Sequence, residues 1–178
     1  MRATDVKTWT IRLEDWVIPD GGYPRLLNEE INSEGIYVPH VTERFPEFAL
    51  EFDSPGFMRA DKPEKACQPL EGGRYRISGE VRYIYDKFEE HGDGLFIIDF
   101  GLFAYVERNW PEDLAVGQYY EAEGELLVDK YYYTEFSHEY EGVPPIVYSW
   151  EVLDVEDAYV LTCVKLDKPP KFKSSSYE

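Results

Sequence analysis

The sequence is short of cysteine and of basic residues, and each shortage argues against a class of function. Only two cysteines occur among the 178 residues, Cys67 and Cys163, and their wide spacing excludes the close pairing of a zinc knuckle or a redox dithiol. Lys and Arg number 18 against 36 Asp and Glu, so the formal net charge is −18 (18 − 36). A chain with this charge repels a phosphate backbone and attracts basic partners.

Long apolar runs are also missing. No segment is apolar for long enough to span a bilayer, and residues 1–11 lack the positively charged start and apolar run of a secretory leader. We therefore expect a cytoplasmic protein without a membrane segment.

The motifs of the common enzyme classes are absent as well. The sequence has no Gly-x-Ser-x-Gly elbow, no phosphate-binding glycine loop and no His-Glu-x-x-His helix, and His40 and His138 are each remote from any obvious nucleophile. Residues 89–93, Glu-Glu-His-Gly-Asp, contain metal-ligand side chains, but such runs in surface loops are usually just solvated. We expect no enzymatic activity, no cofactor and no metal ion.

Aromatic residues, by contrast, are abundant. They make up 16% of the chain, with 15 tyrosines, and hydrophobic residues make up 43%. This composition favours a folded protein over an acidic disordered one. We predict an N-terminal β-rich extension with a proline-rich crossing over residues 1–72, a barrel over 73–166 and a frayed basic tail over 167–178.

Alternating apolar and polar residues predict an all-β fold. The expected strands lie within residues 5–19, 48–52, 74–85, 119–130, 146–155 and 158–166, with a hairpin over 95–107. The strand at 146–155 is expected to close the barrel, and the stretch at 158–166 to pair with the N-terminal part.

Two short helices and one unpaired crossing are expected between these strands. The helices are predicted at 25–31 and at 108–115, the second capped by Asn109 with Pro111 in its first turn. Residues 53–73 contain three prolines and end in Gly72-Gly73, which predicts a surface crossing without a packed element.

Two glycines frame the strand around which the barrel is arranged. Gly117 precedes it and suits a tight turn, because it has no Cβ to resist the turn conformation. From Tyr120 to Asp129, apolar residues alternate with acidic ones, and Gly124 falls on the apolar face. A glycine there predicts a sharp bend or the close approach of another backbone, as at the corner of a small barrel.

Three pieces of the sequence carry a resemblance to a known fold. They are Tyr75-x-Ile77-x-Gly79-x-Val81, Phe96-x-Ile98-Asp99-x-Gly101 and Leu114-x-x-Gly117-x-x-Tyr120-x-Ala122-x-Gly124-x-Leu126. In this order they resemble the first strand, the second-to-third hairpin and the fourth strand of the oligonucleotide/oligosaccharide-binding fold, the OB-fold. The resemblance spans about residues 73–156 and implies a five-stranded Greek-key barrel. It is a resemblance of fold, and so it transfers no function.

The resemblance implies a ligand site on the third strand and on the loop after the fourth. The aromatic and acidic residues at these places are Phe103, Tyr105, Tyr131, Tyr132, Tyr133, Glu135, Phe136, Glu139, Tyr140 and Glu141. OB-folds that bind nucleic acid surround their aromatic residues with basic ones, whereas the neighbours here are acidic. The alternative is that the tyrosines at 131–133 fold over the barrel end or over the N-terminal strands, burying their rings and leaving their hydroxyl groups in water.

Charges on the first and fourth barrel strands have a structural interpretation. Those two strands pair in the OB-fold, so Arg74, Arg76 and Arg82 are expected beside Glu121, Glu123 and Glu125. Such exposed cross-strand ion pairs are worth only about a few tenths of a kcal/mol each.

The sequence therefore predicts a non-catalytic acidic binding module whose partner is a basic protein. One concrete version is an immunity-type or inhibitor protein that masks a toxin such as a nuclease. The alternatives are an OB-fold module that binds single-stranded nucleic acid or oligosaccharide through an aromatic groove, and a structural subunit whose strands at 95–106 or 158–166 pair with another copy. Binding to nucleic acid is not expected, and the oligomeric state is left open.

Overall fold

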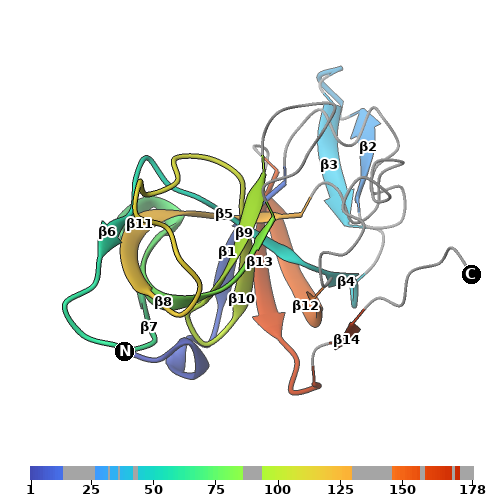
Figure 1. Cartoon of the computed structure of the whole chain (residues 1–178). Coiled ribbons are helices and arrows are strands. Elements are labelled where there is room, and N and C mark those ends of the chain that lie inside the picture. The colour runs from blue at the N-terminus through green and yellow to red at the C-terminus, as the bar shows by residue number, and fades with distance from the viewer. Residues whose placement is uncertain are drawn as a thin grey trace, which may run out of the picture. The chain divides into compact units, whose positions relative to one another are not determined.

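The computed structural model describes residues 1–13, 27–31, 33–35, 37–41, 44–85, 94–129, 146–156, 159–169 and 171–172. The chain divides into two compact units, which we describe separately (Figure 1). The barrel unit comprises Met1–Lys7 and Leu50–Leu127, and the sheet unit comprises Thr8–Ala49 and Val128–Glu178. Each unit is thus built from two stretches of chain.

The barrel unit is built around five strands that close on themselves. These are β5 (Leu50–Asp53), β8 (Arg74–Tyr85), β9 (Leu95–Asp99), β10 (Phe103–Val106) and β11 (Tyr119–Val128). The neighbours around the ring are β5, β10, β9, β8 and β11, and β11 lies next to β5 again. The β5–β10 pair is parallel, whereas β10–β9, β9–β8 and β8–β11 are antiparallel. The protein is therefore mainly β with a closed five-stranded barrel, which is compatible with an OB-like fold.

The strand that closes this barrel is not the expected one. The prediction that residues 146–155 close it is wrong, because β12 (Ile146–Glu156) pairs with β13, β14 and β4. The closing strand is β5, which precedes the other four in sequence and aligns Leu50 with Ala104. Leu50, Glu51 and Phe52 are all buried. Both segments are rich in apolar residues, and such a pattern predicts a strand without specifying its neighbour.

The close approach predicted at Gly124 is confirmed. A Cβ added to Gly124 would overlap the carbonyl oxygen of Asp53 on β5 and lie 3.0 Å from Cζ of Phe52. Gly79 of β8 has a similar role, since its added Cβ would lie 2.6 Å from the carbonyl oxygen of Asp99. The barrel therefore closes tightly at places where neighbouring strands bring their backbones together.

No helix occurs in the connection from β10 to β11, all of whose residues the structure describes. Residues 107–118 form turns instead, in which Gly117 takes the left-handed conformation (φ 88°) and Asn109 also has a positive φ (60°). Tyr120 anchors these turns by donating its hydroxyl hydrogen to the carbonyl oxygen of Asp113, at 2.7 Å. The predicted helix at 108–115 is wrong because Asn109, its expected cap, enters a turn.

Residues 53–73 contain more structure than expected. They include β6 (Met58–Arg59), β7 (Ala66–Pro69) and a 3-10 turn at Glu71–Gly73, and a second 3-10 turn, Ala3–Asp5, lies at the N-terminus. β7 pairs with β8, and β6 pairs with β11. The buried thiol of Cys67 lies on β7. The prediction of a crossing without packed elements is therefore wrong for this part of the unit.

The sheet unit contains β1 (Trp9–Arg12), β2 (Leu27–Ile31), β3 (Tyr37–Val41), β4 (Glu47–Phe48), β12, β13 (Val160–Lys165) and β14 (Lys171–Phe172). β13 lies between β1 and β12, and it aligns Cys163 with Trp9. This confirms the predicted pairing of residues 158–166 with the N-terminal part. Its core includes the stacked rings of Phe48 and Trp150, whose centroids are 5.1 Å apart.

One predicted helix in this unit is a strand. Leu27–Ile31 is β2, and it pairs with β3 in a separate two-stranded sheet. Apolar residues at three positions within two turns also fit a short strand, so the pairing with β3 decides the conformation. Within the described ranges, no helix has the length and apolarity that crossing a membrane requires.

Candidate functional site

A β-bulge in β8 organises the polar side of the barrel. Val81 aligns with Ile98 and Tyr83 with Ile97, so Arg82 is an extra residue on β8. A bulge of this kind redirects the side chains that follow it. Glu80 and Asp99 align before the bulge, and Arg82 extends its guanidinium toward both carboxylates.

The bulge also changes the face on which two tyrosines lie. Within residues 74–85, Tyr83 and Tyr85 have the same odd-numbered parity as Val81, so strict alternation predicts all three on one face. Because Ile97 and Ile98 lie on opposite faces of β9, their partners Tyr83 and Val81 must do so too. The prediction for both tyrosines is therefore wrong: they lie on the outer face of the barrel.

The outer face of the hairpin and its neighbours is consequently aromatic. One row across four strands contains Tyr83, Ile97, Tyr105 and Glu51, and the next contains Glu80, Asp99 and Phe103. Phe103 and Tyr105 were predicted as binding residues, and the structure places both here. Strict alternation in β8 assigns Tyr83 to the opposite face, so the sequence did not predict it here. Nothing in the sequence indicated that Glu51 would lie in this row.

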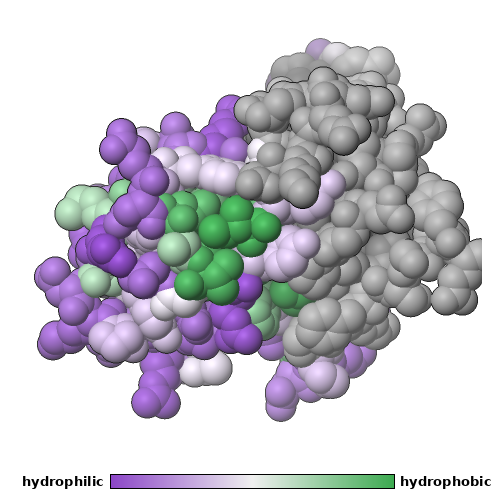
Figure 2. All heavy atoms as spheres, viewed as in Figure 1, coloured by the Kyte–Doolittle hydropathy of each residue, from purple (hydrophilic) through white to green (hydrophobic). Residues whose placement is uncertain are grey.

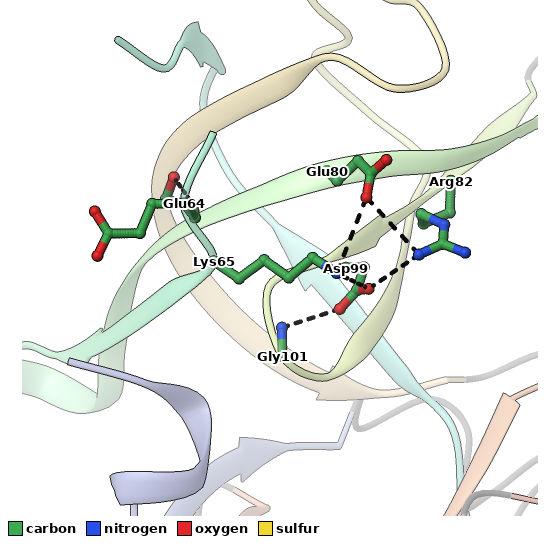
Figure 3. A network of polar contacts seen from close by, with 7 residues as sticks. Glu64, Lys65, Glu80, Arg82, Asp99 and Gly101 are labelled. Carbon is green, nitrogen blue, oxygen red and sulfur yellow. Dashed lines mark hydrogen bonds and ion pairs between the residues drawn. The ribbon is translucent and has the colours of Figure 1, made fainter. Parts of the chain in front are cut away.

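A network of polar contacts lies on this outer face (Figure 3). Nζ of Lys65 is 2.7 Å from Oδ2 of Asp99, and Nη1 of Arg82 is 3.5 Å from the same oxygen. The other oxygen of Asp99 accepts a hydrogen bond from the backbone N–H of Gly101, at 3.0 Å. Oε2 of Glu80 lies 3.9 Å from Nζ of Lys65 and 3.7 Å from Nη1 of Arg82.

This network compensates a buried carboxylate. The side chain of Asp99 is 8% exposed, and an ionised group in such a place is costly unless it is paired and hydrogen-bonded. The hydrogen bond from Lys65 to Asp99 in turn raises the pKa of Lys65. Lys65 and Arg82 are therefore already bound to carboxylates, and the network has the geometry of a structural ion cluster.

The aromatic face is largely closed to solvent. Tyr105 is 9% exposed and Ile97 only 1%, and all five residues of β9 are buried. Phe103, Tyr83 and Tyr85 are half-buried. A nucleic-acid base that stacks on an OB-fold needs an open ring, and each of these five aromatic or apolar side chains on the face is at least half covered.

Other surfaces of the barrel unit remain open. Met58 is 73% exposed and Val116 is 60% exposed. Figure 2 shows hydrophobic residues gathered on the visible face of this unit, with hydrophilic residues around them.

The expected cross-strand ion pairs are present for two of the three arginines. The pairing of β11 with β8 aligns Glu123 with Arg76. Oε1 of Glu123 lies 2.5 Å from Nη2 of Arg76, and Oε2 lies 3.6 Å from Nη2 of Arg74. These contacts lower the pKa of Glu123, chiefly through the hydrogen bond from Arg76. Arg82 does not join them, because β11 begins opposite Glu80 and so its glutamates lie farther along β8; Arg82 contacts Glu80 and Asp99 instead.

The remaining predicted binding residues lie outside the described residues. They are Tyr131, Tyr132, Tyr133, Glu135, Phe136, Glu139, Tyr140 and Glu141. The acidic run at 89–93 also lies outside them. Among the side chains that the structure does describe, no group of three or more His, Cys, Asp or Glu residues is placed to hold a metal ion.

Comparison of the chain with protein-family models, with curated protein sequences and with solved structures gave no match. The likeness to an OB-fold therefore depends on the closed five-stranded ring itself.

Proposed function

We propose that this protein is a non-catalytic binding module whose partner is a basic protein. The observation that supports it best is the excess of acidic over basic residues, together with the ion pairs that already engage several of the cations. Ion pairs within the described part of the chain hold Arg44, Arg59, Lys65, Arg74, Arg76 and Arg82 against carboxylates. The chain carries twice as many acidic as basic residues, so the remaining charge available to a partner is negative.

Tyrosines beside acidic residues suit such a partner. Rings supply contact area at little cost in side-chain entropy, while carboxylates steer and pair with Lys or Arg. Residues 131–141 have this composition, with five aromatic residues and three glutamates. An immunity-type or inhibitor protein that masks the basic active site of a toxin is the concrete form of this proposal.

The second candidate is an OB-fold module for single-stranded nucleic acid or oligosaccharide. The aromatic outer face with Tyr83, Tyr85, Phe103 and Tyr105 favours it. Membership of the OB-fold superfamily, which we also propose, would agree with either function. The paired cations and the buried strand β9 favour the basic protein instead, because nucleic-acid binding needs free positive charge beside open rings.

Affinity purification from the native extract tests the proposal. The tagged chain is incubated at low and at moderate salt, with and without nuclease, and the eluate is identified by mass spectrometry. We expect one basic protein, retained after nuclease treatment and lost when Tyr131, Tyr132 and Tyr133 are replaced by alanine. Recovery of nucleic acid would favour the second candidate, and recovery of neither would favour a structural subunit.

A further inference from the structure

The sheet unit exposes two large apolar side chains from neighbouring strands. Phe45 is 55% exposed, although it lies beside the buried residues Pro46 and Phe48. Leu153 of β12 is 50% exposed. Single exposed apolar residues are common on protein surfaces, so two on one sheet face point to an interaction surface only together with a second feature, here the charge around them.

The pairing of β12 brings these two side chains to the same face. The backbone N–H of Val152 donates to the carbonyl oxygen of Arg44, and that of Trp150 donates to Pro46, so the pairing of β4 with β12 continues to residue 44. In this register Phe45 lies opposite Glu151. Val164 of β13 lies opposite Glu151 on its other side, so these three residues share the outer face.

A second bulge presents Leu153 on this surface. β12 aligns Val152 with Cys163 and Asp154 with Thr162, which makes Leu153 the extra residue. Its neighbour Val152 is 4% exposed, so the bulge separates a core residue from an exposed one. Bulges are typical places at which a strand redirects a side chain for function.

Arg44 contacts both Phe45 and Glu151 at one side of the patch. Its guanidinium lies 5.3 Å from the ring centroid of Phe45, and Nη2 is 2.7 Å from Oε2 of Glu151. Nε of Arg44 also donates to the same oxygen, at 2.9 Å. Phe45 and Glu151 therefore both contact Arg44, whose own side chain is 67% exposed.

Acidic residues surround the apolar centre. On the same face, or at its margin, the strands carry the carboxylates of Glu47, Glu151, Asp154 and Glu156 and the guanidinium groups of Arg12 and Arg44. Asp154 and Glu156 are exposed. The excess of carboxylates makes this rim complementary to Lys and Arg, whereas an acidic partner would be repelled.

We propose that Phe45, Leu153 and Val164, with the acidic rim, form a docking surface for a basic protein segment. We name it the Phe45–Leu153 patch. The segment that fits carries apolar side chains for the centre and Lys or Arg side chains for the rim. This inference rests on the proposed function for the charge of the partner, and it assigns contact residues other than 131–141.

A titration with synthetic peptides tests the patch. The probe is a fluorescent peptide of alternating Lys and Leu, and its counterpart of alternating Glu and Leu is the charge control. We expect saturable binding of the Lys-Leu peptide alone, detected by anisotropy, with backbone NMR shifts confined to residues 44–47, 151–156 and 164. The variant Phe45→Ser/Leu153→Ser should weaken binding at least about tenfold, because exposed anchors at the centre of a patch dominate affinity.

A matched variant on the barrel unit controls for non-specific binding of the peptide to exposed apolar side chains. Met58→Ser/Val116→Ser removes two apolar side chains that are at least as exposed, and it should leave the affinity unchanged. The variant Glu156→Lys should weaken the binding of the Lys-Leu peptide and strengthen the binding of the Glu-Leu peptide. Equal losses in both serine variants, unchanged affinity in the Phe45/Leu153 variant, or no saturable binding would each overturn the assignment.

Two further results separate this inference from its alternatives. Sedimentation velocity that reveals a dimer, lost in the Phe45/Leu153 variant, would identify a second copy as the occupant and overturn the basic segment. If affinity purification yields a basic protein that this variant still binds, the patch assignment fails while the proposed function stands. If purification yields no basic protein but the peptide still binds at the patch, only the proposed function fails.

Discussion

The substitution Gly124→Ala should weaken the barrel unit specifically. A methyl group at this position would overlap the carbonyl oxygen of Asp53, and it would sit 3.0 Å from the ring of Phe52. Strand β5 must then move away from β11, and this separates the two strands at which the ring closes. Overpacking of this kind typically costs about 1–3 kcal/mol. With a urea dependence of about 1–3 kcal/mol/M, the unfolding midpoint should fall by roughly 1 M.

The two cysteines provide an assay that reports each unit separately. Cys67 lies in the barrel unit and Cys163 in the sheet unit, both are fully buried, and burial raises the pKa of each thiol to about 12. Pulsed alkylation at increasing urea, read by peptide mass spectrometry, therefore gives one midpoint for each unit. We expect Gly124→Ala to lower the Cys67 midpoint.

The matched control is Gly56→Ala. No atom lies within 4 Å of a Cβ added to Gly56, so this variant should leave the Cys67 midpoint unchanged or slightly higher. If Gly124→Ala and Gly56→Ala give the same Cys67 midpoint as the wild type, the tight closure by β5 is refuted.

Three further predictions concern the stability of the same protein. Asp99→Ala removes the acceptor for Lys65 and the Gly101 N–H, and it should lower the unfolding free energy of the barrel unit by about 1–3 kcal/mol; an unchanged Cys67 midpoint would contradict this role. Glu123→Gln breaks only exposed ion pairs and should change the unfolding free energy, measured in the same way, by no more than about a few tenths of a kcal/mol. Because the folded thiol pKa values, about 12, exceed the ordinary value of 9.0, each thiol's contribution to stability is complete below pH 9 and is lost as the pH rises toward 12. The urea midpoint, followed by circular dichroism, should therefore fall less steeply over this pH range in a Cys67→Ala/Cys163→Ala variant, and equal slopes would refute the argument.

Much of the fold could be predicted because several strands alternate cleanly and glycines mark the contacts. Strand β8 has the predicted bounds, and the hairpin of β9 and β10 lies within the predicted range. Gly124 predicted a close approach because a residue without a Cβ on an apolar strand face leaves room for a second backbone. The identity of the approaching strand, β5, was not predictable, because that contact is set by tertiary packing rather than by local pattern.

The site could be predicted only in part, and the reason is one extra residue in β8. Alternation assigns faces correctly until a bulge inserts a residue, after which every side chain changes face. Arg82 has no sequence feature that marks it as bulged, so Tyr83 and Tyr85 were assigned to the wrong face. Phe103 and Tyr105 follow no such irregularity on β10, and their position on the second strand of the hairpin was predictable.

The central claim is that the partner of this protein is basic, and two probes of opposite charge test it most directly. Fluorescence anisotropy is measured for the chain with the Lys-Leu peptide and with a single-stranded oligonucleotide long enough to fill an OB-fold groove, at low and at moderate salt. The account predicts saturable binding of the peptide alone, weaker at higher salt. Saturable binding of the oligonucleotide, with no binding of the peptide, would contradict it.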